Sequence, residues 1–175
     1  MWLRLLQSIR KVCLDPREEI RNHSILTLQY CLTLDGIHIQ DELWAQCFES
    51  VIFTLVTELL EIAQDKSLKE YRNMEGTVIL SVKVLVKVFL HSLASVSRLD
   101  SFRKVWVGVL SCFERFMKVK IRGKISDKVS EIVVEVLKES LVVMKLVVGS
   151  DDSFWELTWL HVKNIAPDLQ SEIFP

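Results

Sequence analysis

Glycine and proline are scarce: five glycines and three prolines in 175 residues. That composition excludes collagen-like and low-complexity chains, and a hydrophobic share of 50% excludes intrinsic disorder. Long apolar runs are also missing. The most apolar stretch, residues 77–90, is interrupted by Lys83 and Lys87, so no segment has the roughly 18 uninterrupted apolar residues of a membrane-spanning helix. A secretory signal pattern is absent from the first residues.

Excess charge of either sign is lacking as well. The 22 basic and 23 acidic residues leave a net charge of −1, whereas a general nucleic-acid-binding protein is normally basic. We therefore expect no nucleic-acid partner.

Motifs for chemistry are equally absent. The four cysteines form no C-x-x-C pair, and three of them lie on apolar helical faces, which predicts free, buried thiols. The four histidines are scattered, and there is no glycine-rich phosphate loop or nucleophile elbow. Acidic pairs occur only at expected helix starts, where the helix dipole explains them. The sequence thus predicts no catalytic, cofactor-binding or metal site and favours a protein that is not an enzyme.

What the sequence does contain is apolar residues at helical spacing along almost its whole length. The pattern predicts one domain over residues 1–175 with seven helices and a short tail, residues 168–175. The predicted helices cover residues 2–13, 16–32, 41–63, 74–95, 100–121, 126–148 and 151–166.

The segment 74–95 is rich in valine, which favours strands. However, Lys83, Lys87 and His91 recur at helical spacing and make one polar stripe on an otherwise apolar helix. We therefore predict a helix here.

The helices are expected to pair in antiparallel fashion, first with second, third with fourth and fifth with sixth. Their spacing is near the 40–47 residues typical of HEAT and armadillo repeats, which predicts an irregular all-α solenoid without a sheet; a compact bundle is the alternative. Helices 74–95 and 126–148 are apolar on most of their circumference, as expected of inner helices. The apolar first helix starts without a cap, which suggests a fragment of a larger protein.

Two groups of polar residues are candidates for an interaction surface. The first is the start of the second helix, where Arg17, Glu18, Arg21 and Asn22 are expected to point outward. They form either a docking surface for another domain or simply a capped helix start.

The second group is basic and lies at the end of the fifth helix: Arg115, Lys118, Lys120, Arg122 and Lys124. Arg115, Lys118 and Arg122 are expected on one face of that helix, with Lys120 and Lys124 beside them near the turn. The group is either a solvated helix end or a contact for an acidic partner or an anionic membrane. A third cluster, Phe154, Trp155 and Trp159, either closes the core or is an exposed anchor.

Two segments resemble a known family. LDPREEIRNHS (residues 14–24), followed by LTLQ (residues 26–29), fits a D-x-R-E-E-x-R-N-H helix start, and IAPDLQSEIFP (residues 165–175) fits the end of the same region. Both resemble the C-terminal HEAT-like region, homology downstream of the Sec7 domain, of large Golgi-type Arf guanine-nucleotide exchange factors, in the form closest to the plant GNOM type.

The resemblance implies a cytoplasmic protein that is peripheral on Golgi or endosomal membranes and acts in vesicle trafficking. It implies Arf-family small GTPases and other domains of the parent protein as partners. Exchange in that family uses a glutamate in an F-R-L-P-G-E-A-Q loop, which is absent here, so the resemblance implies a non-catalytic scaffold or regulatory region. The alternatives are an unrelated HEAT-type adaptor or transport factor, and a small helical enzyme with an unrecognised site.

Overall fold

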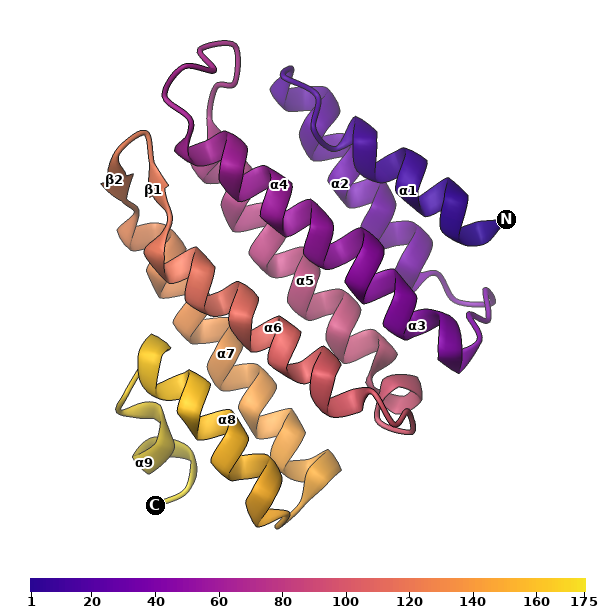
Figure 1. Cartoon of the computed structure of the whole chain (residues 1–175), viewed down its shortest axis with the longest axis vertical. Helices are drawn as coiled ribbons and strands as arrows, with labels where there is room; N and C mark the ends of the chain where they lie inside the picture. Colours follow the sequence, from indigo (N-terminus) through magenta and orange to yellow (C-terminus); the bar gives the residue numbers. More distant parts are fainter.

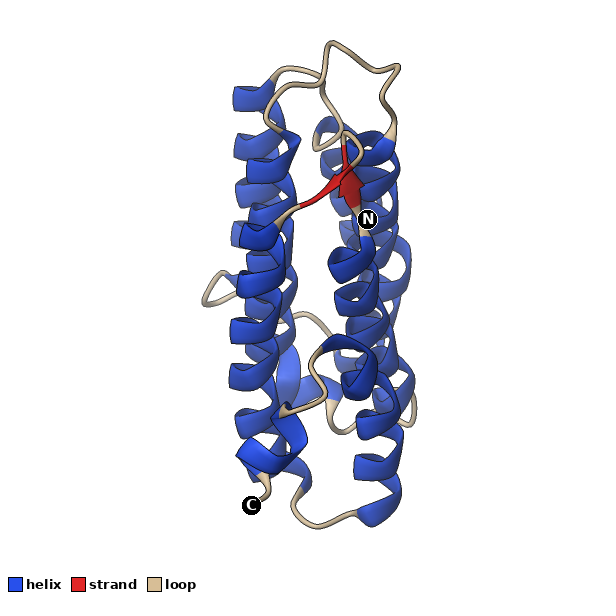
Figure 2. Cartoon of the chain, turned by 90° about the vertical axis from the view of Figure 1, so that its left-hand side faces the viewer, coloured by secondary structure: helices blue, strands red, loops and turns tan.

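The helices lie in two layers in the computed structural model, which describes all of residues 1–175 (Figure 1). Figure 2 shows these layers as two columns. The first layer contains α1 (Trp2–Val12), α3 (Asp41–Cys47), η1 (Phe48–Ile52), α4 (Phe53–Gln64), α6 (Phe102–Lys118) and α8 (Asp152–Ile165). The second layer contains α2 (Glu18–Thr33), α5 (Met74–Val96) and α7 (Asp127–Val148).

Successive helices of the first layer pack on one another, and every one except α8 also packs on a pair partner in the other layer. The pairs are α1 with α2, the continuous helix α3–η1–α4 with α5, and α6 with α7. The predicted all-α solenoid of antiparallel pairs is therefore confirmed. The pairs are unevenly spaced, because the second one, starting at Asp41, is longer than a HEAT unit.

Helix α5 is the centre of the stack. Thirteen of its 23 residues are buried, and it packs on α2, α3, α4, α6 and α7. Lys83, Lys87 and His91 form the exposed stripe expected from the sequence. The helix Asp41–Gln64 and α5 are long and apolar enough to cross a membrane by length and composition, with 50% and 61% of their apolar windows buried in the stack. Packing between the layers accounts for this apolar character.

A row of aromatic rings joins successive pairs through the core. Phe48 contacts Phe89 with ring centroids 6.1 Å apart, Phe89 stacks on Trp106 at 5.4 Å, and Trp106 reaches Phe154 at 6.3 Å. Of the predicted aromatic cluster, Phe154 and Trp155 are buried, and Trp159 stacks on Trp155 at 5.4 Å. Core closure, rather than an exposed anchor, is thus the role of this cluster.

The expectation of a fold without any sheet is wrong in one place. Helix α6 ends at Lys118 instead of Ile121, and the chain forms a two-stranded antiparallel ribbon, β1 (Lys120–Ile121) and β2 (Lys124–Ile125). Between the strands Arg122 and Gly123 have φ angles of 51° and 87°. Positive φ angles at two consecutive residues form a tight turn whose twist matches that of a β-hairpin. Glycine adopts such angles readily, which explains Gly123 at the second position.

One further expectation needs correction at the C-terminal edge. Helix α7 is not an inner helix: only six of its 22 residues are buried, and Leu146 is 83% exposed. The short tail, residues 168–175, contains α9 (Leu169–Ile173), which packs on α7 and α8. Lys138 holds Glu172 at 2.6 Å, so the tail covers part of the edge.

Candidate functional site

Arg21 anchors the start of α2 from inside the protein. Its side chain is fully buried and donates hydrogen bonds to Thr77 Oγ1 at 2.9 Å and to three carbonyl oxygens: Asp15 at 3.2 Å, Pro16 at 3.0 Å and Arg72 at 2.7 Å. The prediction that Arg21 points outward is wrong. Helical spacing placed it beside Arg17, but the preceding turn and the loop before α5 cover it.

The neighbours of Arg21 compensate for its burial. Burial lowers the pKa of the guanidinium, and the Glu18 carboxylate acts in the opposite direction. The Tyr71 ring lies 5.8 Å from the guanidinium carbon, within range of a cation–π contact. The Thr77 hydroxyl, which accepts from Arg21, in turn donates a hydrogen bond to Asn22 Oδ1 at 2.7 Å. Asn22 is thus a structural contact as well as a candidate surface residue.

Arg17 and Glu18 lie at the surface. Arg17 is paired with Asp15 through bonds of 2.9 and 2.8 Å, and this pairing lowers the pKa of Asp15 to about 2. The contribution of that pair to stability is therefore complete above the ordinary Asp pKa near 3.8 and is lost as the pH falls through 2. Glu18 accepts a hydrogen bond from Asn73 at 2.7 Å.

The five basic candidates do not share one helix face. Arg115 donates to Thr57 Oγ1 at 2.8 Å, Lys118 is exposed at the end of α6, and Lys120 and Lys124 lie on the ribbon. Arg122 lies in the ribbon turn, where its guanidinium donates to the Tyr71 carbonyl and its backbone N–H donates to the Ala63 carbonyl at 3.3 Å. The expected alignment of Arg115, Lys118 and Arg122 on a helix is wrong, because α6 ends before Arg122.

The two candidate groups, about a hundred residues apart in sequence, meet at the loop 65–73. Arg21 binds the carbonyl of Arg72 and Arg122 binds that of Tyr71, the adjacent residue. Figure 1 shows the ribbon, the loop before α5 and the turn before α2 at the same, upper ends of their helices. We call this surface the polar end: the turn 13–17, the loop 65–73 and the ribbon 120–125.

Sequence reasoning missed the contribution of the loop 65–73 to the polar end. A hollow of about 450 Å³ lies between this loop and the ribbon, lined by Arg72, Asn73, Glu75 and Arg122 among others. Asn73 and Arg122 both have positive φ, 56° and 51°, a conformation that costs energy in residues other than glycine. The polar composition of residues 64–73 marked a loop, but nothing in it showed which helices the loop joins.

The cysteine side chains are packing residues rather than reactive groups. Burial raises the pKa of Cys13 and Cys112 to about 12 and that of Cys47 to about 11, which keeps these thiols protonated and unreactive at neutral pH. All four cysteines are free thiols, but only Cys13, Cys47 and Cys112 are buried as expected, whereas Cys31 is half-buried. No group of three or more His, Cys, Asp or Glu side chains converges in a geometry that holds a metal ion.

These features define the class: a stacked helical-repeat protein built from antiparallel helix pairs. The chain matches, over residues 2–169, the family described as "GBF1-like, tetratrico peptide repeat region". It belongs to that family.

The full length of the chain is 54% identical to the ARF guanine-nucleotide exchange factor GNOM and 46% identical to the ARF guanine-nucleotide exchange factor GNL1, both of Arabidopsis thaliana. It is also 28% identical to the Golgi-specific brefeldin A-resistance guanine nucleotide exchange factor 1 homolog of Caenorhabditis elegans. The chain spans only 12%, 13% and 9% of these proteins. No solved structure matches it. The resemblance to large Arf exchange factors is thereby confirmed.

The burial of Arg21 predicts a large loss of stability on its removal. Arg21→Ala leaves carbonyl groups without donors and is expected to lower the free energy of unfolding by about 3 kcal/mol, while Arg21→Lys, which keeps the charge without the planar fork, gives an intermediate loss. The measurement is urea unfolding followed by circular dichroism.

Arg17→Ala is the matched control, since its exposed ion pair contributes little. Equal effects of Arg17→Ala and Arg21→Ala would contradict the buried network.

Proposed function

We propose that this chain is a non-catalytic helical scaffold segment of a large Arf guanine-nucleotide exchange factor that acts in vesicle trafficking. The observation that carries the proposal is the match of the whole chain to a small part of such exchange factors. The F-R-L-P-G-E-A-Q loop associated with exchange is absent from the sequence. The nucleotide-exchange step then belongs to another domain of the parent protein.

The polar end is the part of the scaffold that contacts other domains of the parent exchange factor. Its framework is rigid, because Arg21 and Arg122 bind adjacent carbonyls of one loop. On that framework Lys120 and Lys124 are exposed and form no ion pair within the chain, so they can pair with acidic groups of another domain. Arf-family GTPases are partners of the assembled exchange factor rather than of this segment alone.

The location that follows is cytoplasmic, at the surface of Golgi or endosomal membranes. The exposed lysines of the polar end add a weak contact with anionic lipid headgroups. Each basic side chain near such a surface contributes about 1 kcal/mol, which supports reversible binding.

The scaffold proposal predicts no exchange activity in the isolated chain. Release of a fluorescent GDP analogue from an Arf-family GTPase is expected to proceed at the intrinsic rate when the chain is added, because no residue of the chain displaces the nucleotide. A full-length exchange factor of the family is the positive control. Clear acceleration by the chain alone contradicts the proposal.

The membrane contact predicts salt-sensitive binding to anionic vesicles. Lys120→Glu combined with Lys124→Glu is expected to weaken co-sedimentation with phosphatidylserine-containing vesicles by more than roughly tenfold at low salt, since two attractive charges become repulsive. Both side chains are exposed, so the fold is retained.

The control is Lys83→Glu combined with Lys87→Glu, which changes the net charge equally on the exposed stripe of α5. Equal loss in both variants would show that net charge, and not the polar end, governs binding.

A further inference from the structure

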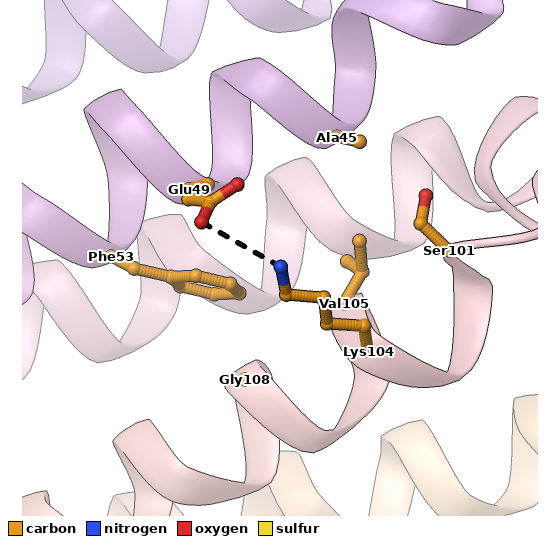
Figure 3. Close-up of a pocket in the computed structure, with 7 residues that line it drawn as sticks. All are labelled: Ala45, Glu49, Phe53, Ser101, Lys104, Val105 and Gly108. Atoms are coloured by element: carbon orange, nitrogen blue, oxygen red, sulfur yellow. Dashed lines mark ion pairs between the residues drawn. The ribbon is translucent and has the colours of Figure 1, made fainter.

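A second surface lies along the first layer, in the groove between the helix α3–η1–α4 and helix α6. Two hollows follow one another in it, of about 190 and 270 Å³. Figure 3 shows the first, in which the Phe53 ring, Val105 and Gly108 face one another and the Glu49–Lys104 ion pair crosses the mouth at 3.7 Å. The second lies between Leu60 of α4 and Val119, beyond the end of α6.

Two local features of the backbone shape the first hollow. Gly108 has no side chain, and a Cβ atom at this position would lie only 2.6 Å from Phe53 Cζ. On the opposite wall, η1 (Phe48–Ile52) is a π-helical turn inside an otherwise α-helical element. Such turns accommodate one extra residue, cost stability and are frequent at functional sites.

The walls of the groove carry opposite charge. From Asp35 to Asp65 the chain has seven acidic residues and no Lys or Arg, and two of the acidic residues, Glu49 and Glu61, line the hollows. The α6 wall presents Lys104 and Lys118, while Arg115 of the same wall donates a hydrogen bond across the second hollow to Thr57. The Glu49 and Lys104 side chains remain 71% and 78% exposed. An exposed pair at this distance contributes little to stability, so both groups are available to a partner.

We propose that this groove binds an amphipathic α-helix of a partner protein. Glu49 and Leu60, which mark the two hollows, are eleven residues apart on one helix, a distance of about 16 Å. A partner helix that lies along the groove therefore places apolar side chains at positions i and i+11, one in each hollow, with i+4 and i+7 over the stretch between the hollows. Its basic edge faces Glu49 and Glu61, and its acidic edge faces Lys104 and Lys118. This inference goes beyond the scaffold function and does not depend on it.

The test uses a synthetic peptide of about five helical turns, labelled with fluorescein, and the full chain. The peptide carries leucine at i, i+4, i+7 and i+11, lysines along one edge and glutamates along the other. A peptide of the same composition with the leucines spread around the helix is the peptide control. Binding is measured by fluorescence anisotropy.

We expect the patterned peptide to bind and the control peptide not to bind. Lys104→Glu weakens binding at least fivefold through the basic wall, and Ala45→Trp, which fills the first hollow, weakens it more than tenfold. Lys87→Glu, an equal charge change on the other layer, leaves binding within twofold. Lys104→Glu alone decides the result if Ala45→Trp lowers the helical circular dichroism signal.

Several results overturn the proposal: no binding of the patterned peptide, equal binding of both peptides, or equal affinity of wild type and Lys104→Glu. Sedimentation equilibrium that shows a dimer broken by Lys104→Glu would assign the groove to a second copy of the chain and also overturn it. No GTPase is present in the assay, so its failure is distinct from that of the nucleotide-release experiment.

Discussion

Burial of α5 between neighbours in both layers is the constraint on which the rest of the structure depends. Neighbours on several sides force a helix that is apolar over most of its circumference, and they leave only the Lys83–Lys87–His91 stripe exposed. The aromatic row through Phe89 and Trp106 then fixes how the next pair stacks. Because each pair contacts only its neighbours, the chain is a layered scaffold with long outer grooves rather than a closed core with an interior site.

Because the helix pairs are antiparallel and stack in the same orientation, the connections within successive pairs lie at the same end of the molecule. The turn before α2, the loop before α5 and the ribbon before α7 all lie at one end, and two arginines join them by donating to the carbonyls of Tyr71 and Arg72. The buried Arg21 and the exposed Arg122 thereby satisfy carbonyl oxygens of the loop, which have no partner within a helix. The lysines around them make no such bonds and stay available. The two arginines therefore hold the loops of the polar end together, and the lysines are its exposed charged groups.

The helices and their pairing could be predicted from periodicity, because polar stripes such as that of α5 are local signals. The role of Arg21 could not, since its burial depends on a loop some fifty residues away. The ribbon after Lys118 could not be predicted, because the pair Arg122–Gly123 fits the end of a helix as well as the turn of a hairpin. The exposure of Leu146 on α7 and the packing of α9 depend on which neighbours the stack has at its edge, and no residue pattern within α7 shows this. The basic residues 115–124 could be recognised from composition. Their arrangement in space could not, because it depends on where α6 ends and on the turn at Arg122 and Gly123.

Because α5 is buried by neighbours in both layers, we expect it to be the most stable element, to which the Arg21–Thr77 hydrogen bond joins the polar end. Native-state hydrogen exchange tests this directly, since it measures the opening free energy of each backbone amide. We expect amides from Val82 to Phe89 to exchange only through global unfolding, with opening free energies equal to the free energy of unfolding and above those of α1 and α9. Faster exchange in this part of α5 than in α1 would show that burial of α5 does not govern the stability of the stack.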